Sequence, residues 1–455
     1  MPRFRHARQH DIDAIRRAAR PLASLADTDS LVDAIGDARL VLLGEATHGT
    51  EEFYRLRADL TCRLIEGRGF DAVAVEADWP SALRASRWAQ GEGSADTVDT
   101  ALADFERFPR WMWRNTEVAR WLGWLRSHNA QQPDATRRVG FFGLDLYSLR
   151  DSMEAVVRYL DGVDPEAAQR ARARYACFDD LANEPQAYGH AVTFGLRPDC
   201  ERGVLQQLTE LCRRAADRLP LGDGLAGDEL FYAQQNARVV HNAETYYRTM
   251  FGGRTDSWNV RDQHMAETLQ LLDQHLARSR GRPARIVVWA HNSHIGDARA
   301  TDAAERGQLN LGQLVRETAR PGDAFLLGFT THAGNVMAAA DWDAPAERKT
   351  VVPSRPDSVE RLLHDTGIER LVLPLRGADG ALRRAFEGHL LERAIGVVYR
   401  PDTERWSHYF EAALARQFDA VVHLDTTCAL RPLDGADAEA AEAPSTEAET
   451  YPSGL

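Results

Sequence analysis

The chain has 455 residues, of which 44% are hydrophobic and 27% charged, and this composition excludes a protein that is disordered or fibrous over most of its length. Its net charge is −13 and no basic stripe is visible, which argues against a nucleic-acid binder because phosphate contacts require clustered Lys and Arg. No run of about 18 apolar residues occurs, so we expect no membrane-spanning helix.

Short apolar runs along the chain predict the strands of a buried sheet. Near-continuous apolar runs are typical of strands that are covered on both faces. The clearest runs are residues 39–44, 71–76, 138–145 and 285–290. Weaker runs follow at 324–330, 336–340, 396–400 and 420–425.

Helical patterns occupy the segments between these runs. After the first strand, Phe53, Leu56, Leu60 and Leu64 recur at helical spacing, which predicts a helix with one buried face. Residues 79–128 and 149–274 contain almost no strand signal, and the second segment is interrupted at Pro185, Pro198 and Pro220.

The alternation of strands and helices predicts an α/β fold with a central, mostly parallel sheet flanked by helices. In this fold, residues 149–282 form a large helical insertion over the cleft. We assign residues 1–432 to one domain. Residues 433–455 are acidic and rich in Ala, Pro, Ser and Thr, so we expect a disordered tail there.

Cysteine usage and the N-terminal residues bear on the compartment. The five cysteines are few, odd in number and without a C-x-x-C pair, which argues against a disulfide framework or a zinc knuckle. Residues 1–12 are polar and basic and lack the apolar stretch of a secretion signal. We therefore expect a cytoplasmic protein. No feature of the sequence indicates an oligomeric state.

Four predicted strands end at ionisable side chains. In open α/β sheets ligands bind outside the carboxyl ends of the strands, so these groups are expected to meet at one cleft. Several carboxylates and imidazoles in a small space suit general acid–base chemistry or metal binding. The groups are Glu45, His48, Glu76, Asp78, Asp145, His291 and His294.

Each of these groups also has an ordinary structural interpretation. Glu45, Glu76 and Asp145 are compatible with helix caps or with acids at helix N-termini, and His291 with a satisfied loop histidine. An aromatic group is equally open to two interpretations, as core packing or as a wall for an apolar substrate. It consists of Trp111, Trp113, Trp121 and Trp124.

Common catalytic motifs are absent from the sequence. No G-x-S-x-G occurs, so a serine nucleophile elbow is not predicted. The sequence also lacks H-E-x-x-H and a P-loop.

The motifs that are present resemble those of the erythromycin esterase family. The first is LGEATHG at 43–49, and the second begins with WRNTE at 113–117. FGLD at 142–145 and the pair Arg261-Asp262, followed by WAHNSHI at 289–295, complete the set. The resemblance extends from about residue 30 to residue 425, in order.

The resemblance implies a hydrolase that opens a macrolide-type lactone or another ester without a covalent serine intermediate. His48 corresponds to the general base that activates water, and Glu45, Glu76 and His291 complete the catalytic group. The arginine after GEATHG corresponds to Arg57, with Arg55 as a second match. The resemblance also implies a small-molecule ester or lactone as partner and a role in antibiotic resistance. As substrate-binding residues we predict Arg57, Arg55, His294, Asp78, Asp145 and Trp113.

Two alternatives remain open at this point. The same His and Glu cluster supplies enough nitrogen and oxygen ligands for a divalent metal, although we expect no cofactor. A polar cleft beside tryptophans also suits a non-catalytic binder of an apolar ligand. Between His291 and His294, the sequence does not select the one that contacts substrate.

Overall fold

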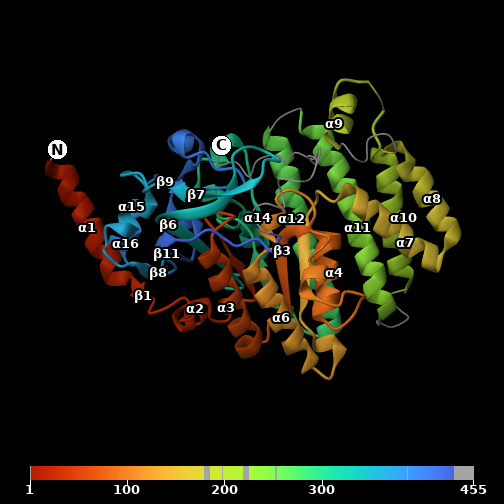
Figure 1. Ribbon diagram of the computed structural model, residues 1–455, viewed down its shortest axis with the longest axis horizontal. Coiled ribbons are helices and arrows are strands. Elements are labelled where there is room, and N and C mark those ends of the chain that lie inside the picture. The colour runs from red at the N-terminus through yellow and green to blue at the C-terminus, as the bar shows by residue number, and fades with distance from the viewer. Residues whose placement is uncertain are drawn as a thin grey trace.

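A sheet of nine strands lies at the centre of the computed structural model, which describes residues 2–178, 185–196, 198–218, 225–251, 254–386 and 388–434 (Figure 1). The strand order is β1-β8-β11-β6-β2-β5-β3-β4, and β7 pairs with the far end of β6. The strands are β1 (Arg20–Pro21), β2 (Leu40–Leu43), β3 (Ala72–Asp78), β4 (Gly140–Asp145), β5 (Ile286–Trp289), β6 (Ala324–Ala339), β7 (Ala346–Val351), β8 (Arg370–Pro374) and β11 (Ala420–Thr427).

Six neighbouring strands of this sheet, from β11 to β4, are parallel, and β1, β7 and β8 pair antiparallel at its margins. The register aligns the carboxyl ends of the central strands. Trp289 of β5 lies opposite Leu43 of β2 on one side and Val75 of β3 on the other, and Val75 lies opposite Gly143 of β4. The residues that follow these positions therefore emerge at one edge of the sheet.

Helices cover both faces of the sheet because successive side chains of a buried strand point to opposite sides. Val41 and Leu43 pack towards α2 (Asp29–Ile35), α3 (Glu51–Arg68), α4 (Trp79–Ala89) and α6 (Thr116–Ala130). Leu40 and Leu42 pack towards α1 (Pro2–Ala18), α12 (Arg254–Arg280), α14 (Leu311–Thr318), α15 (Val359–His364) and α16 (Gly380–Ala385). The α/β fold with a mostly parallel sheet is thus confirmed.

The helices between β4 and α12 form a layer at one end of the molecule, opposite α1, α15 and α16 (Figure 1). They have their own apolar core, which includes Leu160, Leu211 and Tyr246. These helices are α7 (Leu149–Val163), α8 (Pro165–Tyr175), α9 (Pro185–Thr193), α10 (Glu201–Arg218) and α11 (Leu225–Thr249), whereas α12 packs on the sheet. Pro185 begins α9 and Pro198 separates α9 from α10, whereas Pro220 lies outside the described residues.

Two strand predictions need correction. The runs 324–330 and 336–340 belong to one strand, β6, which continues through Gly334 at φ 135°. A side chain there would collide with the carbonyl oxygen of Thr427, 2.0 Å from the ideal Cβ position. Residues 396–400 form no strand, and Val398 makes only an isolated bridge to Ala339. A small separate sheet pairs β9 (Leu390–Arg393) with β10 (Tyr409–Ala412).

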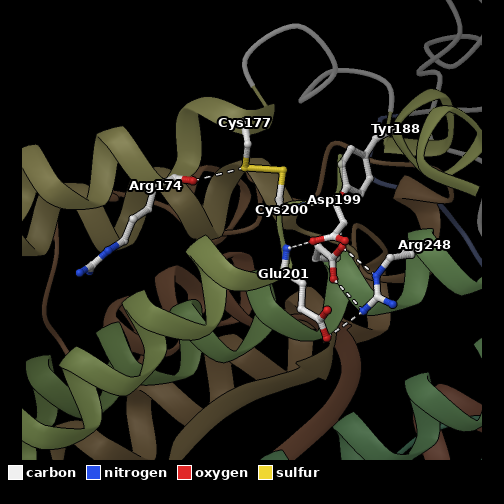
Figure 2. The surroundings of a disulfide bond; sticks show 8 residues. Arg174, Cys177, Tyr188, Asp199, Cys200, Glu201 and Arg248 are labelled. Atoms are coloured by element: carbon white, nitrogen blue, oxygen red, sulfur yellow. Dashed lines mark hydrogen bonds and ion pairs between the residues drawn. A yellow bond between two sulfur atoms is a disulfide. The ribbon is translucent and has the colours of Figure 1, made fainter. Parts of the chain in front are cut away.

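The sequence argued against a disulfide framework, and the described residues contain a single disulfide. Cys177 is bonded to Cys200 at the start of α10, with the Cα atoms 5.9 Å apart (Figure 2). The backbone N–H of Cys200 also donates to the hydroxyl of Tyr188, 2.8 Å away, so both ends of the α9 segment are tied together. A 23-residue spacing within a helical segment carries no signature of such a bond in the sequence.

Two further observations concern the membrane and the C-terminal segment. Within the described ranges, every helix is too short or too polar to cross a bilayer. The predicted tail lies largely outside the described residues, but its first residues do not. Asp434 forms an ion pair with Arg114, whose Nη2 is 2.5 Å from the carboxylate.

Candidate active site

The loop after β2 and the helix α3 together carry a buried chain of three ionisable side chains. Arg57 Nη2 donates to Glu45 Oε2 at 2.7 Å, and Glu45 Oε1 lies 2.9 Å from His48 Nδ1. All three side chains are at most 1% exposed. Since a carboxylate only accepts hydrogen bonds, His48 carries a proton on Nδ1 and, when neutral, presents the lone pair of Nε2.

Two glycines of the GEATHG motif allow this loop to lie close to its neighbours. A Cβ atom on Gly44 would come within 2.1 Å of Asn292 Oδ1, and one on Gly49 within 1.8 Å of the Met337 carbonyl oxygen. Asn292 in turn donates from Nδ2 to the Phe329 carbonyl at 2.7 Å. The motif therefore fixes the loop against β6 by packing that only glycine permits.

Glu76, near the carboxyl end of β3, is held as a carboxylate at the same edge of the sheet. Arg261 Nη2 donates to Glu76 Oε1 at 2.7 Å, and the backbone N–H of His291 donates to Oε2 at 2.8 Å. Burial alone would raise the pKa of Glu76, but His294, Arg261 and His48 lower it well below its ordinary value. Glu76 is therefore ionised.

His291 begins the short helix α13 (Asn292–Ile295) and is held in one tautomer. Its Nδ1 accepts the backbone N–H of Ser293 at 3.2 Å and lies 2.8 Å from the Ser293 hydroxyl. Burial, and then the proximity of His48, lower the pKa of His291 well below its ordinary value. The ring is therefore neutral with its proton on Nε2, an atom without a hydrogen-bond partner among the described residues. Its centroid is 4.8 Å from that of His48.

His294 lies behind Glu76 in a network centred on Arg261. Its Nδ1 is 2.9 Å from both oxygens of Asp262, and Trp258 stacks on its ring with centroids 4.6 Å apart. Its Nε2 is 3.1 Å from Arg261 Nη1 and 3.4 Å from Glu76. Arg261 also binds both oxygens of Asp145, at 3.1 and 2.6 Å, so one guanidinium joins two strand ends.

A cavity with an empty volume of about 480 Å³ opens at this edge of the sheet. Predicted site residues that line it are His48, Glu76, Asp78, Asp145 and Trp113. Glu45, Arg57, His291 and His294 are buried beside it, each at most 1% exposed. Arg55 is exposed on the other side of α3 and does not reach the cavity.

Asp78 faces the cavity from the end of β3 and is paired with Arg107. The guanidinium lies 3.1 Å from both carboxylate oxygens. Burial raises the pKa of Asp78 above its ordinary value, and the nearby charge of Asp145 adds to this effect, whereas Arg107 opposes it. The cavity thus contains carboxylates of unlike basicity.

Comparison with known proteins identifies the family of this chain. The family model "Erythromycin esterase" matches residues 65–427, most of the chain. The chain belongs to the erythromycin esterase family. The matched range includes Glu76, Asp145 and His291 and starts after Glu45 and His48.

Individual relatives of this erythromycin esterase family member are distant. It is 26% identical to erythromycin esterase type II of Escherichia coli over 67% of this chain and 71% of that protein. It is 24% identical to the putative hydrolase YbfO of Bacillus subtilis (strain 168) over 90% of each chain.

Solved structures share the fold. A mutant of the erythromycin esterase EreC, solved in its open conformation, matches with a TM-score of 0.63 at 18% identity, over 90% of this chain and 98% of that one. A protein described as a succinoglycan biosynthesis protein matches with a TM-score of 0.73 at 20% identity, over 93% and 98% of the two chains.

Sequence reasoning did not name several residues of the site in this erythromycin esterase family member. Arg261 and Asp262 were noted only as part of a motif, and Ser293 only within WAHNSH. Arg107 was missed altogether. A salt-bridging arginine in the middle of a helix or loop has no periodicity that distinguishes it from a surface arginine, so only the family motif pointed to Arg261.

The arrangement does not suit a resident metal ion. Both oxygens of Glu45 and both oxygens of Glu76 are already hydrogen-bonded. The guanidinium groups of Arg57 and Arg261 occupy the positions beside these carboxylates that a metal cation would take. In the described part of the chain, no group of three or more His, Cys, Asp or Glu side chains has the arrangement of a metal site. The donor set fits acid–base chemistry better than metal coordination.

His264, one turn after Arg261 on α12, makes the stability of the protein depend on pH. Asn242 Nδ2 donates to its Nδ1 at 2.9 Å, and burial lowers the pKa of His264 to about 4. Since an unfolded histidine has a pKa of about 6.5, the unfolded chain binds a proton between pH 6.5 and 4 that the folded protein does not. The free energy of unfolding should therefore fall with decreasing pH, by roughly 3 kcal/mol from this residue at pH 4.

Replacing His264 by asparagine should weaken this pH dependence, as measured by urea unfolding at pH 7 and pH 4.5. The same substitution at His10, which is exposed on α1, should leave the dependence unchanged. If the His264 variant loses as much stability between pH 7 and pH 4.5 as the wild type does, His264 is not the source of the pH dependence.

Proposed function

We propose that the protein is a carboxylic ester hydrolase in which His48 acts as general base on a water molecule, without a covalent serine intermediate. The single observation that carries this proposal is the buried chain from Arg57 through Glu45 to His48. It holds the imidazole in the tautomer whose Nε2 accepts a proton, on a side chain that lines the cavity.

In this mechanism His48 Nε2 removes a proton from water as the water oxygen attacks the carbonyl carbon. The carbonyl π electrons move to oxygen and form a tetrahedral oxyanion. Its collapse breaks the bond to the alkoxide, which takes the proton from His48. The products are an acid and an alcohol, or a hydroxy acid when the substrate is a lactone.

His291 is the best-supported donor for the oxyanion. It is neutral and its ring adjoins that of His48, but the side chain is buried beside the cavity, so donation to the oxyanion requires the cavity to open towards it. Loss of one such donor typically raises the barrier by about 3–4 kcal/mol. Glu76 supports it by accepting the backbone N–H of His291, and Arg261 neutralises Glu76.

The substrate class follows from the cavity and the relatives together. The cavity is lined by polar side chains together with the aromatic rings of Trp113, Phe105 and Phe108. We propose that it holds the ester group between Trp113, Asp78 and Asp145, with the rest of the substrate outside. A macrolide-type lactone, and with it a role in antibiotic resistance, is proposed from the relatives named erythromycin esterases.

A cytoplasmic location is part of the same proposal. An enzyme there would act on compounds that have entered the cell. The disulfide between Cys177 and Cys200 weighs against this location, because disulfides are rare in reducing compartments.

The test is turnover of a panel of alkyl esters, lactones and macrolides by the purified chain, with the acid product identified by mass spectrometry. We expect at least one ester or lactone to be opened in the presence of a strong chelator. Binding without hydrolysis across the panel would favour a non-catalytic binder, and activity that disappears with the chelator and returns with a metal would favour a metal-dependent enzyme.

A further inference from the structure

A buried carboxyl group that the mechanism above does not use lies behind the reaction site. Glu392 on β9 is fully buried and forms no ion pair with any described residue. Its Oε1 accepts a hydrogen bond from Asn292 Nδ2 at 3.2 Å, and its Oε2 has no hydrogen-bond partner among the described residues. Because a buried carboxylate without a cation is costly, such a group is stabilised by a proton instead.

The groups that face Glu392 carry a single charge, and that charge is negative. Glu360 on α15 repels a negative charge on Glu392, and Phe410 of β10 lies opposite it in the small sheet. Gln417, at the end of α18 (Leu414–Gln417), hydrogen-bonds to the carboxyl group. The next residue along β9, Arg393, points to the other side of the strand and binds backbone carbonyls and a tyrosine hydroxyl.

Of the two neighbouring glutamates, Glu392 is the one that holds a proton. Glu360 accepts the backbone N–H of Arg393 at 2.8 Å and interacts with the charge of that arginine. Glu392 has neither, and burial, followed by the charge of Glu360, raises its pKa to about 8. Gln417 Oε1 also lacks a partner among the described residues. Since the oxygen and nitrogen of a glutamine amide occupy interchangeable positions, a proton on Glu392 Oε2 can be donated to that oxygen.

Asn292 connects this acid with the reaction site. Besides its bond to Glu392, the side chain binds β6 twice: Nδ2 donates to the Phe329 carbonyl at 2.7 Å, and the Phe329 N–H donates to Oδ1 at 3.2 Å. The backbone N–H of Asn292 donates to the Glu45 carbonyl at 2.9 Å, and Asn292 directly follows His291. One amide therefore joins Glu392 to the two loops that carry the histidines of the site.

We propose that Glu392 is a positioning residue for the hydrolysis: as a neutral acid it holds the amide of Asn292, and with it the backbone that carries His291. The inference rests on the ester-hydrolase function and adds to it a residue outside the cavity. Loss of the proton would leave two negative charges side by side in the interior, and the packing between α13, α15 and β9 must open to hydrate them. The reaction should therefore fail at alkaline pH through kcat, with KM little changed.

Hydrolysis of the best ester of the panel between pH 7 and pH 9 tests this role. Wild-type kcat should fall about tenfold over this range, as the acid loses its proton, while KM stays within about twofold. Glu392→Gln keeps a neutral acceptor for Asn292, so it should retain most of kcat at pH 7 and lose the alkaline fall. Glu392→Met has no such acceptor and should lower kcat at both pH values. Glu411→Gln, which changes an exposed glutamate on β10, should keep the wild-type profile.

The proton itself is measured without any substrate. An infrared difference spectrum between the wild type and Glu392→Gln should contain the carbonyl stretch of a protonated carboxylic acid at pH 7, and this band should disappear at alkaline pH. Circular dichroism at each pH checks that the fold is retained.

Three outcomes would overturn the inference while leaving the hydrolase intact: a wild-type kcat that does not fall by pH 9, a fall that persists in Glu392→Gln, or absence of the acid band. If no ester is hydrolysed, the NMR signals of the His291 ring, assigned by their loss in His291→Asn, decide instead. A change between pH 7 and pH 9 that Glu392→Gln removes would retain the positioning role while the hydrolase loses support. Signals that respond equally in both proteins, or in neither, would overturn it.

Discussion

Replacing His48 by asparagine is expected to lower kcat by about 10²–10⁴-fold while leaving the fold intact. Asparagine keeps a donor near the position of Nδ1 and so can still bond to Glu45, but it has no basic nitrogen to take a proton from water. The measurement is steady-state hydrolysis of the best ester of the panel, with thermal unfolding as the check on folding.

A matched substitution on another histidine controls for general effects. His128 stacks on Trp124 at the end of α6, away from the cavity, and its replacement by asparagine should leave kcat within about twofold of the wild type. Retention of wild-type kcat by the His48 variant would remove the general base from the mechanism.

Replacing Arg261 by methionine is expected to lower the free energy of unfolding by about 3–5 kcal/mol. The guanidinium is 3% exposed and balances two buried carboxylates, Glu76 and Asp145. Methionine has a similar length but leaves both negative charges without their partner. Urea unfolding at pH 7.5 measures the loss, and Arg172→Met, which removes an exposed ion pair to Asp161, should cost at most about 1 kcal/mol.

A double variant separates the electrostatic cause from lost packing. Adding Asp145→Asn to Arg261→Met removes one of the two unpaired charges and should recover part of the lost stability. If the second substitution only adds to the loss, the effect of Arg261→Met arises from packing and the charge argument is wrong.

The meeting of Glu45, Glu76, Asp145 and His291 was predictable because it depends on topology alone. Parallel neighbouring strands end at the same edge of a sheet, so four strand-end motifs were sufficient to place these residues together. The three strands at the margins were not predicted. Two-residue β1 has no pattern and β7 (AERKTV) is mostly polar, so neither differs from a loop in sequence. Arg370–Pro374 contains an apolar run, Leu371–Leu373, like that of β2, and this signal was overlooked.

The two arginines on α3 show how finely the sequence can discriminate. Arg57 lies four residues after Phe53 and next to Leu56, on the apolar face of the helix, and is buried against Glu45. Arg55 falls on the opposite face and is exposed. The helical period therefore supports Arg57 over Arg55, in agreement with the order in which the family motif ranked them.

The hydrogen-bond partners of the histidines were beyond sequence reasoning. Asp262 reaches His294 from α12, and Ser293 fixes the tautomer of His291 through its backbone N–H. The Asp262 contact depends on where a helix from the insertion meets the sheet edge, which no local pattern specifies, whereas the Ser293 contact is a local N-cap contact at the start of α13.

The central claim is that water attacks the acyl carbon directly, and a quenched single-turnover reaction in ¹⁸O-labelled water tests it most directly. The chain, in excess over a hydrolysable ester, is stopped during turnover, and products and intact protein are weighed by mass spectrometry. We predict one ¹⁸O atom in the released acid, an unlabelled alcohol and an unchanged protein mass. Unlabelled acid, or protein that carries the mass of the acyl group, would contradict the account.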